Sequence, residues 1–116
     1  MKEFALIFRA NKGTDDKPTP EQVQERIKWL SNIAAQNKLV GRGISLSHDS
    51  AKTVKRDNIV TDGPYAEIKE FISGFIIIKA ETLEKAVEIA KTNPIFGIGG
   101  SVEVRELINL YDKKVI

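Results

Sequence analysis

Two short runs in this chain are apolar at every position, and they restrict the fold more than any other feature of the sequence. Residues 4–8 read Phe-Ala-Leu-Ile-Phe, and residues 75–78 read Phe-Ile-Ile-Ile. Successive side chains of a strand point to opposite faces of a sheet, so a strand that is apolar throughout needs cover on both faces. The fold must therefore bury both faces of a sheet that contains these two strands.

Two helices are predicted between the strands. The first begins with a capping box in which Thr19 is the cap and Gln22 stands three residues later, and it is expected to end near Lys38. Its predicted apolar stripe consists of Val23, Ile27, Leu30, Ile33 and Ala34. Trp29 falls beside this stripe and is expected to pack in the core. The second helix is capped by Thr82, and its predicted buried face consists of Leu83, Ala86, Val87 and Ala90.

The remaining strands complete a recognisable order. Strands are expected over residues 39–47, 74–80 and 101–107, with a hairpin over residues 53–61 that turns at Arg56-Asp57-Asn58. The order predicts one α+β domain over residues 1–116, a ferredoxin-like βαββαβ fold with an inserted β-hairpin. Two helices cover only one face of such a sheet. We therefore expect a homodimer whose sheets pack face to face and form a dimeric α+β barrel.

Composition excludes several classes of protein. The 116 residues contain no Cys and one His, and their 18 Lys and Arg are balanced by 16 Asp and Glu. The cations are spread among acids, so we expect no nucleic-acid partner. No apolar stretch approaches the roughly 20 residues of a membrane span, and residues 4–8 are too brief for a signal-peptide core. A cytoplasmic location, no membrane partner, no metal and no cofactor are the expectations.

The last predicted strand carries charge on one face. Val102 and Val104 point to one side, and Glu103 and Arg105 point to the other. If the valines meet the helices, the charged pair projects between the two sheets and indicates a polar cavity. The alternative is that this strand is an exposed edge and the pair is solvated.

Residues 60–70, VTDGPYAEIKE, place several charges and an aromatic ring around one turn. Asp62-Gly63-Pro64 shapes a turn, or it places Asp62 as a general base or anchor at the mouth of a cavity. The Tyr65, Glu67 and Lys69 side chains suit a lid over a polar pocket or a surface ion-pair network. Arg105 can hold a carboxylate or phosphate with its planar fork, or it can form a salt bridge with Glu103 or Glu67.

The second half of the chain resembles a known family. Residues 62–67 (DGPYAE), 69–70 (KE), 74–75 (GF) and 99–105 (GGSVEVR) are similar to the motifs of the DGPF-type branch of the YCII-related proteins. The resemblance implies a dimeric α+β barrel of ferredoxin-like protomers, in a group proposed to be enzymes but mostly without assigned substrates. Tyr65 stands where that pattern has Phe, and Ile68 where it has Thr.

A histidine role implied by the wider family does not transfer. Related enzymes have a proposed His and Asp pair with the His on the first helix, whereas no His occurs between Pro20 and Lys38 in this chain. The single histidine, His48, is expected at the end of a strand and is assigned no catalytic or metal-binding role.

These observations lead to one expected function and one alternative. The first is a dimer that binds a small acidic metabolite and catalyses a cofactor-free proton transfer, isomerisation or elimination. Asp62 is then the catalytic residue. The expected substrate-binding residues are Arg105, Tyr65, Glu67, Lys69 and Ser101. The alternative is a non-catalytic dimer that senses a ligand or docks on another protein.

Overall fold

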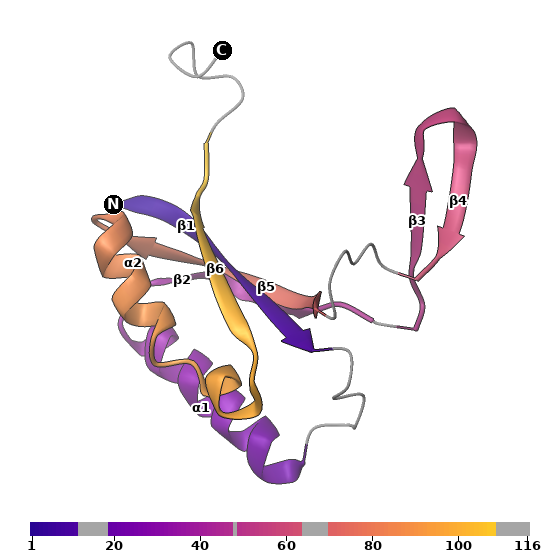
Figure 1. The fold of residues 1–116 in the computed structure, drawn as a ribbon. Coiled ribbons are helices and arrows are strands. Elements are labelled where there is room, and N and C mark those ends of the chain that lie inside the picture. Colours follow the sequence, from indigo (N-terminus) through magenta and orange to yellow (C-terminus); the bar gives the residue numbers. More distant parts are fainter. Residues whose placement is uncertain (12–18, 48, 64–69, 109–116) are drawn as a thin grey trace.

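A computed structural model describes residues 1–11, 19–47, 49–63 and 70–108 (Figure 1). Its strands are β1 (Lys2–Asn11), β2 (Leu39–Ser45), β3 (Lys52–Lys55), β4 (Ile59–Asp62), β5 (Glu70–Ala80) and β6 (Ser101–Glu106). Its helices are α1 (Pro20–Ala35) and α2 (Leu83–Ala90), with short 3₁₀ helices η1 (Arg56–Asn58) and η2 (Pro94–Ile98). The order of elements is the one predicted, although β2 ends two residues earlier and β5 begins four residues earlier than expected.

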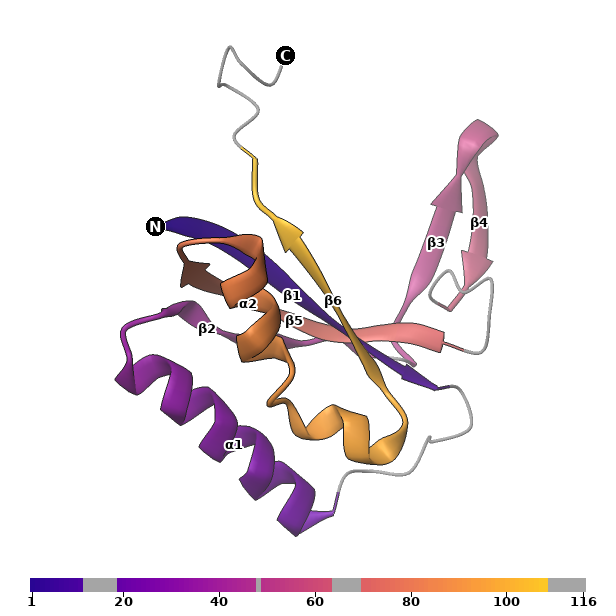
Figure 2. The same cartoon turned by 60° about the vertical axis from the view of Figure 1, so that its left-hand side comes forward.

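The main sheet has the strand order β2-β5-β1-β6, and each described pairing is antiparallel. Both α1 and α2 lie on one face of this sheet (Figures 1 and 2). This arrangement confirms the ferredoxin-like α+β fold. The sheet built by the described residues is open, so these residues form no closed barrel within one chain.

Every second side chain of β1 and of β5 points into the core on the helix side of the sheet. Phe4 and Leu6 of β1 and Ile76 and Ile78 of β5 are almost completely buried there. The helices add Trp29, Ile33, Ala86 and Ala90 to the same cluster. The small alanines let α2 lie close to the sheet, because only a methyl group separates its backbone from the strands.

Both helix starts follow from their capping residues. The Thr19 hydroxyl accepts a hydrogen bond from the Gln22 backbone N–H at 3.2 Å, and the Gln22 side chain accepts one from the Thr19 N–H at 3.0 Å. The Thr82 hydroxyl accepts from the Lys85 backbone N–H at 3.1 Å. Each cap satisfies backbone donors that have no partner within the helix.

The predicted stripe of α1 is wrong at three positions. Ala34 and Val23 are exposed, and Ile27 keeps 51% of its surface in solvent. The helix instead turns Trp29 and Ile33, which are four residues apart, toward the sheet. Burying the large indole removes more apolar surface from water than burying Ile27 would, so Trp29 sets the rotation of the helix. The expectation that Trp29 packs in the core is confirmed.

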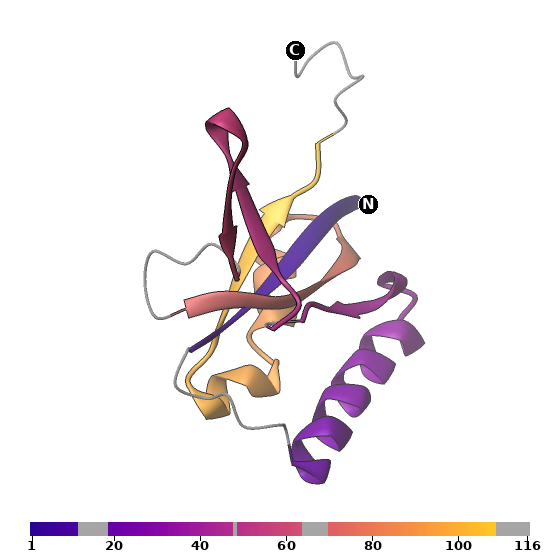
Figure 3. The ribbon, with the colours of Figure 1, turned by 90° about the vertical axis from the view of Figure 1, so that its right-hand side faces the viewer.

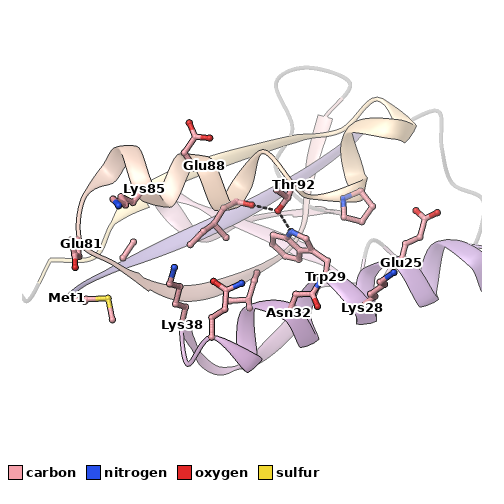
Figure 4. A pocket seen from close by; sticks show the side chains of 15 residues that line it. Met1, Glu25, Lys28, Trp29, Asn32, Lys38, Glu81, Lys85, Glu88 and Thr92 are labelled. Atoms are coloured by element: carbon pink, nitrogen blue, oxygen red, sulfur yellow. Dashed lines mark hydrogen bonds between the residues drawn. The ribbon is translucent and has the colours of Figure 1, made fainter.

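Trp29 is held by two specific contacts. Its Nε1–H donates to the Thr92 hydroxyl at 2.7 Å (Figure 4), and the Trp29 and Phe8 rings pack in a T-shaped arrangement at a centroid distance of 5.9 Å.

The predicted face of α2 also needs one correction, because Leu83 in its first turn is exposed. Ala86 and Ala90 are buried as expected.

The face of the sheet opposite the helices is apolar at its centre. Ala5 and Ile7 of β1 pair with Ile77 and Phe75 of β5, and Val40 of β2 pairs with Ile77 from the other side. These side chains are half-buried, and no described helix covers them. We call this surface the open face.

The predicted hairpin is confirmed and projects from the domain. β3 and β4 pair with each other in a separate two-stranded sheet. The turn between them, η1, places Asp57 and Asn58 in the left-handed region, with φ of 64° and 62°. Figures 1 and 3 show the hairpin on the side of the sheet away from the helices. Its Val54, Ile59 and Val60 side chains are exposed.

One glycine permits the close pairing of β2 with β5. A Cβ at Gly74 would lie 2.3 Å from the Ile44 carbonyl oxygen. Because this oxygen belongs to the backbone of β2, it can move aside only if the strand itself is displaced. We expect Gly74→Ala to lower the free energy of unfolding by about 2–3 kcal/mol, the upper part of the range for overpacking. Urea denaturation followed by circular dichroism measures this change.

Gly97→Ala is the matched control, because a Cβ there meets nothing within 4 Å. Its effect is expected to stay within about 0.5 kcal/mol. Equal destabilisation by the two substitutions would show that the close approach at Gly74 is not the limiting contact.

Candidate functional site

The register of β6 against β1 decides where its charges lie. Val102 and Val104 stand opposite Phe8 and Leu6, and both pack against the core on the helix side. Glu103 and Arg105 stand opposite Ile7 and Ala5. The two charged side chains therefore belong to the open face, beside its apolar centre.

A third charged residue completes this group. The Arg9 guanidinium binds one oxygen of Glu103 twice, from Nη2 at 2.9 Å and from Nε at 3.3 Å. Nη1 of Arg105 lies 3.5 Å from the other oxygen of Glu103. We call Arg9, Glu103 and Arg105 the open-face charge cluster. Its two guanidinium groups share one carboxylate, which leaves the cluster with one net positive charge.

Sequence reasoning did not identify Arg9 as a site residue, although a signal was present. Ala5, Ile7 and Arg9 share one side of β1 by simple alternation, opposite to Phe4 and Leu6. The missing information was the strand pairing. Only the register, in which Arg9 pairs with Ser101 and Ile7 with Glu103, brings Arg9 beside Glu103.

Arg105 is the more accessible arginine of the cluster. Its side chain is 70% exposed, whereas the Arg9 side chain is 34% exposed. The single contact at 3.5 Å uses one nitrogen of a group that carries five N–H donors. The Arg105 fork is thus the part of the cluster best placed to bind a carboxylate or phosphate oxygen in two-point contact.

Asp62 lies apart from this cluster, at the base of the hairpin. Its carboxylate forms an ion pair with Lys52 across the β3–β4 ladder, and its side chain is 93% exposed. The next residue, Gly63, has a φ of 82° and donates its N–H to the Ala51 carbonyl at 2.8 Å. This bond extends the β3–β4 ladder by one residue pair, and the pocket beside Asp62 and Gly63 does not include Arg105.

The structure describes three of the six predicted site residues. Ser101 and Arg105 lie near opposite ends of β6, and Asp62 ends β4. Ser101 is half-buried and pairs with Arg9 of the charge cluster. The predicted positions Tyr65, Glu67 and Lys69, together with His48, lie outside the described residues. Their proposed roles remain predictions.

Two further features are absent from residues 1–11, 19–47, 49–63 and 70–108. No three His, Asp or Glu side chains gather there as a set of metal ligands. No helix within those ranges has the length and apolar character that crossing a membrane requires.

Comparison with known proteins identifies the family. A search among curated proteins found no significant match. The model of the YCII-related domain matches residues 3–110, which is nearly the whole chain. The match therefore includes the first half of the chain, which precedes the short motifs found between residues 62 and 105. This chain belongs to the YCII-related family.

Proposed function

We propose that this protein acts as a homodimer that binds a small organic acid between the open faces of its two protomers. The observation that carries the proposal is the open-face charge cluster, in which two arginines share one glutamate beside an otherwise apolar surface. An apolar sheet face requires cover, and a second copy of the same face supplies it by two-fold symmetry.

The hairpin supports the same assembly. A two-stranded hairpin is at best marginally stable in water by itself. Here β3 and β4 project on the open-face side and expose Val54, Ile59 and Val60. Val54 and Val60 pair across the ladder and share one of its faces, so a partner packed on the open face could lie beside that face and remove both side chains from water. The dimer therefore accounts for two exposed apolar surfaces with one contact.

The cluster also defines the chemistry of the ligand. An uncompensated positive charge that becomes enclosed between two sheets needs an anion or ordered water. Arg105 offers the planar donor pair that matches a carboxylate, and Ser101 on the same strand can add a hydroxyl. A small organic acid meets these requirements, with its apolar part against Ile7 and Ile77.

The proposed enzymatic form of this function is a cofactor-free proton transfer, isomerisation or elimination on the bound acid, with Asp62 as the base. A second form, a non-catalytic ligand sensor, is favoured by the position of Asp62. Its carboxylate is solvated and paired with Lys52, whereas a general base gains strength in a desolvated site. Tyr65, Glu67 and Lys69 belong to either form as residues of a lid over the ligand.

Ligand binding is expected to depend on Arg105. A panel of small organic acids is screened by thermal shift, and a ligand at a hundred times its dissociation constant adds about 2.7 kcal/mol of apparent stability. Arg105→Ala should abolish the shift. Arg26→Ala, which removes an exposed arginine from α1, is the matched control and should keep it. A shift that survives Arg105→Ala would contradict a ligand site at the cluster.

Dimerisation is expected to depend on the centre of the open face. Ile77→Asp places a carboxylate in the proposed contact from both protomers, and we expect the dissociation constant to rise about a hundredfold or more. Sedimentation equilibrium measures the change. Ile27→Asp, the same substitution on exposed α1 surface, should leave the dimer intact. A monomeric native protein, or a dimeric Ile77→Asp variant that circular dichroism shows to be folded, would overturn the proposed assembly.

The two forms of the function are separated by hydrogen exchange on the bound acid. An enzyme that removes a carbon-bound proton should exchange that proton for deuterium in D₂O, as proton NMR of the acid detects. Asp62→Asn should then lower the exchange rate at least about a hundredfold. A sensor gives no exchange above the uncatalysed rate, and Asp62→Asn leaves its thermal shift within error of the native protein.

A further inference from the structure

A groove separates the two helices on the side of the sheet opposite the open face. It encloses about 720 Å³, which is within the range of small-molecule sites. The groove exists because the helices have different neighbours: α1 packs chiefly against β2 and η2, and α2 packs chiefly against β5 and β6. It shares no residue with the open-face charge cluster or with the pocket beside Asp62.

The floor of the groove is apolar. Trp29 and Ile33 of α1 line it from one side, Ile89 of α2 lines it from the other, and Ala80 at the end of β5 lies between them. The Trp29 indole is fixed, because its Nε1–H donates to Thr92 and its ring packs against Phe8 in a T-shaped arrangement. A rigid apolar floor favours the flat body of a small molecule over a flexible polar one.

The α1 side of the groove carries polar groups that can bind an anion. Asn32 and Gln36 are one helical turn apart and line the same side, and Lys38 follows just beyond the helix end. Lys38 has a fixed backbone: its N–H donates to the Ile33 carbonyl at 3.2 Å, and its carbonyl accepts from the Lys79 N–H at 2.7 Å. Its ammonium therefore extends from a well-defined position.

The acidic residues that line the groove do not place their carboxylates at its centre. In Figure 4 the ammonium of Lys38 points into the space between the helices, whereas the carboxylates of Glu25 and Glu88 point away from its centre. Glu88 is also engaged by Lys91 at 3.1 Å. Glu81 lies at the end of the groove near Met1. The centre of the groove therefore favours a negative charge.

We propose that this groove is a second binding site, specific for a small carboxylate with a flat apolar body. The body packs against Trp29, Ile33 and Ile89. The carboxylate accepts hydrogen bonds from the Lys38 ammonium and from the amide nitrogens of Asn32 and Gln36. The site is independent of the dimer and of the open-face ligand.

The test uses the only tryptophan of the chain as its reporter. Because Trp29 lines the groove, its fluorescence and its single indole N–H resonance in a proton–nitrogen NMR spectrum report on this site alone. The native protein is titrated with phenylacetate, with the uncharged phenylacetamide and with the cationic phenethylamine. These three compounds share one aromatic body and differ in their polar end.

The proposal predicts that phenylacetate shifts both Trp29 signals in a saturable way and binds about tenfold more tightly than phenylacetamide. Lys38→Met, which keeps most of the aliphatic stem, should weaken phenylacetate about tenfold and leave phenylacetamide unchanged. Lys55→Met in the hairpin is the matched control and should change neither affinity. Arg105→Ala should also leave the groove unaffected, which separates this site from the open-face site.

Three results would overturn the proposal. The first is the absence of a saturable change in either Trp29 signal. The second is equal affinity for phenylacetate and phenylacetamide, and the third is tighter binding of phenethylamine than of phenylacetate. The comparison among the three compounds requires only the native protein, so it decides the question even where Lys38→Met fails to fold.

Discussion

The alternation of side chains along β1 is the constraint on which the rest of the structure depends. β1 is hydrogen-bonded on both edges, to β5 and to β6, so its residues set the faces of the whole sheet. Phe4 and Leu6 fill the core beneath the helices, and Ala5 and Ile7 face the other way. A slip of one residue would exchange these two sets and bring Arg9 into the helix-side core. The register is fixed because that exchange would bury a charge.

The same alternation explains why the open face has an apolar centre and a charged margin. A partly exposed ion pair such as Arg9 with Glu103 contributes about 0–1 kcal/mol to the stability of a single chain. This contribution is too small to explain why charged side chains stand beside an otherwise apolar surface. Its placement is better explained by a proposed contact with a second copy and a ligand, where desolvation strengthens each electrostatic interaction.

Trp29 organises the helix layer in a comparable way. Its indole hydrogen bond to Thr92 connects α1 to the segment after α2, and its contact with Phe8 anchors α1 to the sheet. These contacts hold α1 through Trp29 and Ile33 while Ile27 remains in solvent. The groove between the helices is the geometric result, because α1 is tied to η2 and β2 and not drawn against α2.

The sequence by itself determined the elements, their order and the starts of the two helices. Local signals are sufficient for these features: the apolar period identifies strands and helices, and the Thr19 and Thr82 hydroxyls cap the helices within their own first turns. The motifs around Asp62 and residues 99–105 also indicated the family. The tertiary structure alone decided the rotation of α1, because the Trp29 face and the Ile27 face are both apolar at helical spacing and only packing against the sheet distinguishes them. It also decided that Arg9 joins Glu103 while Asp62 stands apart from Arg105, because strand register and the direction of a hairpin depend on contacts between residues far apart in the chain.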